Sequence, residues 1–250
     1  MLFLACYRSE AIVLRTRDLG EADKAITLYT KDEGKVRAAG RGARRMRSRL
    51  LAVSQPFVHG RYLFFRGKGM DSMAQGELIN SYRQLREELD RMAAAAYLAE
   101  LVDVLVEERD PQEELFRLLL DSFDFLVEHG AKGVLLRFFE LQLMNQLGYR
   151  PRLTDCTICG TRQYVHPRFS VAKGGLLCES CSGEDPAALK ISPGAWETLR
   201  CLLEGRITLV SRLRPLPAVA SEMEEVLRRY VDYRLARPLK SLEFLQTLQG

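Results

Sequence analysis

The sequence predicts an α+β multidomain protein, with an N-terminal β-barrel of the OB-fold type over residues 1–80 and an α-helical domain over residues 81–250 that carries a four-cysteine zinc-binding insert at about 150–186. Three observations predict this. Short alternating segments separated by turn residues fill the first part. From Tyr82, apolar residues recur three and four apart. Two Cys-x-x-Cys pairs interrupt the helical part. The composition, 47% hydrophobic and 28% charged, excludes a disordered chain.

The N-terminal part contains five β-rich segments divided by turn residues such as Asp32-Glu33-Gly34. The expected strands are residues 10–17, 24–30, 35–39, 57–65 and 73–81. So many short strands in so short a stretch favour a small closed barrel, because closure removes the sheet edges. An open antiparallel sheet remains the alternative.

The remainder has the periodicity of amphipathic helices, which we expect at about 82–108, 111–129, 131–147, 192–204 and 217–235. Asp110-Pro111 and His129-Gly130 mark helix ends, and Ser192-Pro193 marks a helix start. No apolar run reaches the ~18–20 residues of a membrane helix. The apolar start is shorter than the ~7–15 residues of a secretory signal core, so we expect a cytoplasmic protein.

Charge is unevenly distributed along the chain. Residues 1–80 hold 15 Lys and Arg against 8 Asp and Glu, whereas residues 81–150 hold 8 against 14 and residues 151–250 hold 14 against 11. The N-terminal part is therefore the one suited to a polyanion, and the acidic middle is expected to serve as scaffold and protein-binding surface.

Four of the six cysteines form two Cys-x-x-Cys pairs with 18 residues between them, namely Cys156, Cys159, Cys178 and Cys181. This spacing is typical of a four-thiolate zinc site, which is coordinatively full and therefore structural. Two disulfides or a redox dithiol are the alternatives, although a reducing compartment disfavours the first and the missing βαβ context disfavours the second. His166 lies between the pairs and could substitute as a ligand, but we expect it to be a surface or core histidine.

A basic segment follows the third expected strand. Residues 41–49 contain five arginines and no acid. On a glycine-flanked loop, guanidinium groups are suited to phosphates, and a solvated charged loop is the alternative. The predicted DNA-binding residues are Lys35, Arg37, Arg41, Arg44, Arg45, Arg47 and Arg49. Nearby aromatic residues could offer stacking faces, although most are expected in the core: Tyr29, Phe57, Tyr62, Phe64 and Phe65.

Signatures of catalysis are missing from the sequence, which has no phosphate-binding loop, nucleophile elbow or zinc-protease motif and only three scattered histidines. We therefore expect a protein that is not an enzyme.

The order of these parts resembles the bacterial RecO family of recombination mediator and DNA repair proteins, over nearly the whole chain. Besides the two cysteine pairs, the matching segments are Glu10-Ala11-Ile12-Val13-Leu14-Arg15, Gly20-Glu21-Ala22-Asp23-Lys24, Gly34-Lys35-Val36, Gly40-Arg41-Gly42-Ala43-Arg44, Gln55-Pro56-Phe57, Gly148-Tyr149-Arg150-Pro151 and Arg237-Pro238-Leu239-Lys240-Ser241.

The resemblance implies an OB-fold that binds single- and double-stranded DNA, anneals complementary strands and assists loading of RecA onto DNA coated by single-strand-binding protein. It also implies two partners, RecR and the acidic C-terminal tail of single-strand-binding protein. A zinc-dependent nucleic-acid enzyme, a transcription regulator, or a zinc-containing nucleic-acid-binding regulator without annealing activity remain as alternatives.

Overall fold

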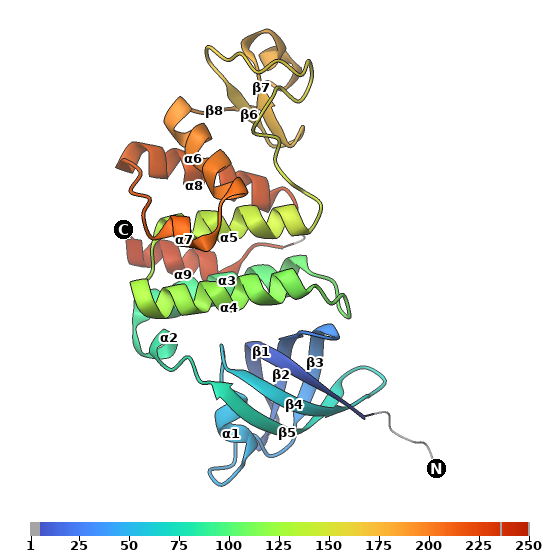
Figure 1. Ribbon diagram of the computed structural model, residues 1–250. Helices are drawn as coiled ribbons and strands as arrows, with labels where there is room; N and C mark the ends of the chain where they lie inside the picture. Colours follow the sequence, from blue (N-terminus) through green and yellow to red (C-terminus); the bar gives the residue numbers. More distant parts are fainter. Residues whose placement is uncertain (1–5, 236, 250) are drawn as a thin grey trace. The chain divides into compact units, whose positions relative to one another are not determined.

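The computed structural model describes residues 6–235 and 237–249, so the first five residues of the predicted barrel domain lie outside the described part. The N-terminal region is a closed five-stranded barrel, which confirms the predicted OB-like fold (Figure 1). Its strands run in the order β1-β2-β3-β5-β4, and β1 pairs again with β4. They are β1 Cys6–Leu19, β2 Asp23–Thr30, β3 Gly34–Gly40, β4 His59–Phe65 and β5 Asp71–Asn80.

The long first strand is what closes the barrel. Its first half pairs with β4 and its second half with β2, and the register shifts between Val13 and Arg15. Such an irregularity bends a strand and increases its twist. The short helix α1, Leu50–Val53, then contributes both of its terminal side chains to the barrel core.

The chain forms two compact units: one comprises residues up to Gly130 and from Leu239, the other Ala131–Pro238. In the first unit the barrel is joined by four helices, α2 Gln84–Glu87, α3 Leu89–Leu105, α4 Glu113–His129 and α9 Lys240–Gln249. The sequence predicts one helix over 82–108, but extended backbone at Glu88 divides it into α2 and α3. No expected helix corresponds to α9, which packs on α3.

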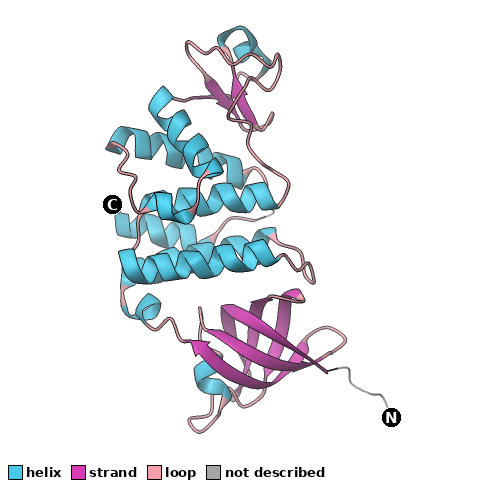
Figure 2. Cartoon of the chain, viewed as in Figure 1, coloured by secondary structure: helices cyan, strands magenta, loops and turns pink. Residues whose placement is uncertain are grey.

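The second unit combines four helices with the cysteine-bearing insert, and Figure 2 shows the short strands of this insert beside the helices. The helices are α5 Gly133–Gln146, α6 Pro193–Glu204, α7 Ile207–Val210 and α8 Pro217–Asp232. The insert contains β6 Arg168–Ser170, β7 Gly175–Leu177, the 3₁₀ helix η1 Glu179–Glu184 and β8 Leu189–Lys190. Ser192 caps α6 as predicted, because its hydroxyl accepts a hydrogen bond from the backbone N–H of Ala195. Among the described residues, no helix is long and apolar enough to cross a membrane.

Candidate nucleic-acid interface and metal centre

The basic loop, residues 41–49 between β3 and α1, is an ordered series of turns. Its backbone is tied to the β1–β2 turn, because Arg44 N–H donates to the carbonyl of Ala22 at 2.9 Å and Gly42 N–H donates to the carboxylate of Asp23 at 2.7 Å. Gly42 has a φ of +67°, a conformation that favours glycine. Ala43 is fully buried in the barrel core. The loop is therefore a fixed support for its side chains.

The five arginines of the basic loop are all exposed, and they differ in their partners. Arg44 donates to the carbonyl of Gly20 at 2.9 Å and forms an ion pair of 3.3 Å with Asp18. The other four form no ion pair or hydrogen bond through their side chains among the described residues: Arg41, Arg45, Arg47 and Arg49. The loop thus presents guanidinium groups whose charge is available to an external anion.

Lys24 extends this basic surface, although no pattern in the sequence marks it. It lies beside Arg44 and Asp18, and burial, opposed by Asp18 and assisted by Arg44, lowers its pKa. Lys24 reaches this position because it pairs with Gly40 across β2 and β3. Only the strand register brings it there, so no local sequence signal could have identified it.

The two predicted DNA-binding residues on β3, Lys35 and Arg37, contact the end of α3 and the segment that follows it. The ammonium of Lys35 is buried and donates to the carbonyls of Asp103 and Val106, at 2.6 and 2.5 Å. Arg37 forms a 2.7 Å ion pair with Glu108. The ammonium of Lys35 is therefore bound to carbonyls at the end of α3, and the guanidinium of Arg37 is paired with Glu108. Both cationic groups have partners within the protein.

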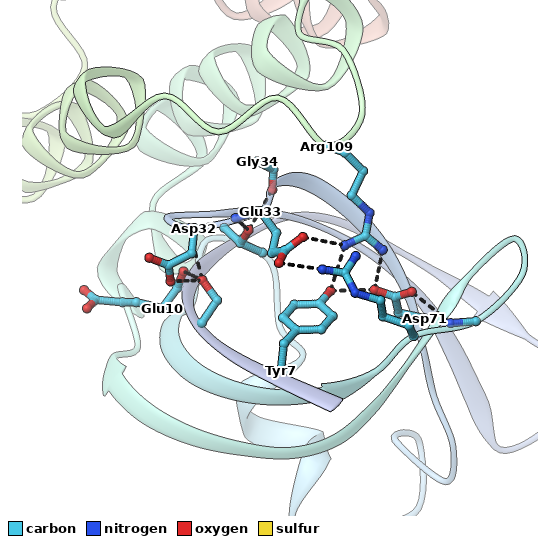
Figure 3. Close-up of polar contacts among 11 residues, drawn as sticks. Tyr7, Glu10, Asp32, Glu33, Gly34, Asp71 and Arg109 are labelled. Atoms are coloured by element: carbon cyan, nitrogen blue, oxygen red, sulfur yellow. Dashed lines mark hydrogen bonds and ion pairs between the residues drawn. The ribbon is translucent and has the colours of Figure 1, made fainter. Parts of the chain in front are cut away.

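The segment that receives these side chains, residues 106–112, is named the strap here. It follows α3 and lies along β3, where Lys35 and Glu108 form a parallel bridge and Arg109 N–H donates to the carbonyl of Lys35. Arg109 also donates to the carboxylate of Asp71 at 2.6 Å and lies 3.4 Å from that of Glu33 (Figure 3). The strap therefore connects the barrel to the helices of its own unit through polar contacts.

The aromatic residues of the barrel are interior rather than stacking faces. Tyr29, Phe57, Tyr62 and Phe64 are all buried, while Phe65 is partly exposed. The Tyr62 hydroxyl donates to the carbonyl of Val53 inside the barrel. The basic loop is accordingly the feature of the barrel best suited to nucleic acid, and it offers contacts to phosphates rather than to bases.

The four predicted metal ligands meet in the insert. The sulfurs of Cys156, Cys159, Cys178 and Cys181 all lie within 4.8 Å of one another. Those of Cys159 and Cys178 are 3.6 Å apart, close to the ~3.8 Å edge of a thiolate tetrahedron with Zn–S bonds of ~2.3 Å. The cluster could hold a metal ion. His166 is exposed and stands outside this group.

The backbone around the cluster favours a thiolate. Burial raises the pKa of Cys156, but hydrogen bonds from the backbone N–H groups of Cys159, Cys178 and Ile158 outweigh it and lower the pKa to about 6. In contrast, the hydrogen bond with Cys178 and burial raise the pKa of Cys181 to about 12. Four thiolates cannot coexist at such short distances without a cation to neutralise them, which is the condition that a bound metal satisfies.

A pocket of about 400 Å³ lies in the second unit, between the start of α5 and the segment that leads into α8. Val134, Pro215 and Met223 contribute apolar surface, and the cationic side chains of Lys132 and Arg214 lie at its wall. The one acidic residue of the lining, Glu224, forms an ion pair of 3.7 Å with Arg137, which also lines the pocket. This combination suits a peptide with apolar side chains and negative charge.

Comparisons with known proteins agree with this architecture. Residues 4–82 match the family model described as "Recombination protein O N terminal", and residues 86–243 match "Recombination protein O C terminal". The chain is 44% identical over 251 residues to the DNA repair protein RecO of Symbiobacterium thermophilum, with 99% of each chain covered. It is 36% identical to the protein of that name from Desulforamulus reducens and to that from Bacillus pumilus, each over 97% of this chain and 94% of the relative. The chain therefore belongs to the RecO family of DNA repair and recombination proteins.

Proposed function

We propose that this protein binds single- and double-stranded DNA through its basic loop, anneals complementary strands, and assists loading of RecA onto DNA coated by single-strand-binding protein. The observation that carries the proposal is the set of four exposed arginines without internal partners, among the described residues, on a fixed loop of an OB-like barrel. Phosphates of two strands neutralised on one surface repel each other less, and the local strand concentration rises. Annealing then requires no covalent chemistry, and we propose that the protein is not an enzyme.

The proposed DNA surface omits Lys35 and Arg37, because their charges are already used by the end of α3 and by Glu108. It includes Lys24, which lies beside Arg44.

The metal in this proposal is one zinc ion, bound by Cys156, Cys159, Cys178 and Cys181. Four soft sulfur donors at tetrahedral spacing suit zinc, and a full coordination sphere leaves no position for an activated water. The metal would hold the insert folded. It would take no part in DNA contacts.

The proposed protein partners are RecR and the acidic C-terminal tail of single-strand-binding protein. For the tail, we propose the 400 Å³ pocket of the second unit, because an acidic peptide gains both apolar burial and attraction to Arg214 there. For RecR we assign no surface. The proposed location of the protein is the cytoplasm, in association with the nucleoid, where DNA and these partners are found.

The proposal is tested by measuring annealing of complementary oligonucleotides, naked and coated with single-strand-binding protein, with and without ATP. The wild type should anneal both substrates without ATP, and the triple variant Arg45→Ala, Arg47→Ala, Arg49→Ala should be markedly slower. Arg37→Ala is the control, because that side chain is paired with Glu108. Annealing of neither substrate, or only with ATP, would refute the mediator function. DNA binding without annealing would favour the zinc-containing regulator instead.

A further inference from the structure

The second unit contains a cluster of aromatic rings around one guanidinium group, where α8 ends beside the segment that follows α5. The guanidinium carbon of Arg234 lies 3.6 Å from the ring centre of Tyr230, 5.1 Å from that of Tyr149 and 5.7 Å from that of Tyr233. Arg150 adjoins Tyr149 in the chain. We call Tyr149, Arg150, Tyr233 and Arg234 the tyrosine platform.

The platform is held from beneath by buried Tyr230. The hydroxyl of Tyr230 donates to the carbonyl of Tyr149 at 2.9 Å, and Arg234 donates through Nη1 to the carbonyl of Tyr230 at 2.7 Å. The Tyr230 ring in turn packs edge-on against Phe169, with centres 5.4 Å apart. The Tyr230 ring, the Arg234 guanidinium and the backbone at Tyr149 are therefore positioned before any ligand arrives, which reduces the entropy lost on binding.

The two outer tyrosines of the platform are exposed to solvent. Tyr149 is 49% exposed and Tyr233 is 65% exposed. Arg150 donates to the side-chain oxygen of Asn145, and neither Arg150 nor Arg234 forms an ion pair with a carboxylate among the described residues. Exposed aromatic rings beside cationic side chains that no carboxylate neutralises are the combination by which proteins bind single-stranded nucleic acid, with bases stacked on the rings and phosphates on the cations.

We propose that the tyrosine platform is a second binding site for single-stranded DNA. Bases stack on Tyr149 and Tyr233, and Arg150 and Arg234 contact the adjoining phosphates. This inference rests on the proposed function, in which the protein binds single strands, and it adds contacts to bases where the basic loop offers contacts only to phosphates. The platform selects single strands, since the bases of a duplex are already stacked on one another and cannot reach the rings.

The test measures binding of fluorescent oligothymidylate and of a duplex of equal length to the full chain. The double variant Tyr149→Ala, Tyr233→Ala should bind the single strand roughly 5- to 150-fold more weakly for each base that no longer stacks, and the duplex unchanged. The double variant Tyr149→Phe, Tyr233→Phe keeps both rings and should bind as the wild type does. Leu216→Ala is the matched control, because Leu216 is 71% exposed just before the start of α8, far along the helix from Tyr233.

Equal affinity of the alanine variant and the wild type for the single strand at every salt concentration would overturn the platform, as would an equal reduction for duplex. A variant that binds DNA normally and fails only to bind RecR would overturn it too, and would assign the surface to a protein partner. If the alanine variant does not fold, as judged by circular dichroism, crosslinking of a bromodeoxyuridine oligonucleotide to the wild type decides. Adducts on Tyr149 or Tyr233 support the proposal, and adducts confined to the barrel overturn it.

The two proposals fail separately. If the triple arginine variant of the basic loop loses salt-dependent binding while the tyrosine variant does not, the platform is excluded and the proposed function stands. If the wild type binds no DNA at all, the proposed function itself fails.

Discussion

Gly34 lies directly against the backbone of Asp110. A Cβ atom at Gly34 would be 2.4 Å from the carbonyl carbon and oxygen of Asp110, and the φ of Gly34 is +64°. The start of β3 and the strap therefore approach more closely than any side chain permits. This contact explains why glycine stands at the turn before the third barrel strand, and it fixes the strap next to Lys35 and Arg37.

Gly34→Ala should lower the free energy of unfolding by more than backbone strain alone would lower it. The left-handed conformation costs an L-residue about 1 kcal/mol, and displacement of the strap adds about 1–3 kcal/mol. Gly20→Ala is the matched control, because Gly20 has a φ of +68° and an alanine methyl group there would have nothing within 4 Å. Urea unfolding midpoints measure the difference. Equal destabilisation of the two variants would show that Gly34 and Asp110 are not in contact.

Asp71 should make stability depend on acid pH. Burial raises the pKa of Asp71, but hydrogen bonds from Tyr7, Gly67 and Arg109 outweigh it and lower the pKa below its ordinary value. The ionised carboxylate therefore stabilises the fold above about pH 4, the pKa of an unfolded aspartate, and this contribution is lost as pH falls further.

Asp71→Asn should accordingly lower the free energy of unfolding by about 3 kcal/mol at pH 7, and by progressively less as the pH falls below about 4 and the wild-type carboxylate becomes protonated. Urea unfolding at a series of pH values measures this. Tyr7→Phe, which removes the hydrogen bond to Asp71 and the one from Arg109 but no charge, should cost about 1–2 kcal/mol at pH 7. A larger difference between wild type and Asp71→Asn at acid pH than at pH 7 would contradict this role of the carboxylate.

Reduced, freshly purified protein should contain one zinc per chain, and chelation should unfold the insert, because the four thiols lose the cation that keeps them together. Cys156→Ser should lower metal content and thermal stability more than DNA affinity. Cys201→Ser should leave the metal content unchanged, since exposed Cys201 lies on α6 outside the cluster. Elemental analysis well below one metal per chain would refute the site.

Arg214→Glu should weaken binding of the acidic tail peptide of single-strand-binding protein by roughly 10-fold, because reversing a charge at the pocket wall replaces attraction by repulsion. Arg212→Glu is the control, since Arg212 is exposed on the same segment but does not line the pocket. Fluorescence anisotropy of a labelled peptide measures both. Equal weakening in the two variants would indicate only a general reduction of positive charge.

The sequence predicts the barrel and the cysteine cluster because their signals are local. Alternation of apolar and polar residues with period two marks each strand. Two Cys-x-x-Cys pairs at this spacing are typical of a metal site when the cysteines are not joined in disulfides. The break at Glu88 and helix α9 lack comparable signals. Both depend on packing between segments far apart in the chain: α9, for example, is anchored where Ser241 donates to the carboxylate of Glu100.

The candidate site is only partly predictable for the same reason. The cluster of arginines in residues 41–49 is visible in the sequence, but charge alone does not separate an exposed arginine from a buried lysine. Lys35 differs from its neighbours because the end of α3 reaches its ammonium, and Lys24 joins the loop through strand register. Both placements come from tertiary contacts that no local pattern records.

Whether the basic loop binds phosphates is decided by the salt dependence of single-stranded DNA binding. The slope of log affinity against log salt should be smaller in the variant Arg45→Ala, Arg47→Ala, Arg49→Ala than in the wild type, by about 0.7 for each phosphate that is no longer neutralised. It should be unchanged in Arg37→Ala. A triple variant with the wild-type slope would show that these arginines are only solvated, and would contradict a DNA-binding role for the loop.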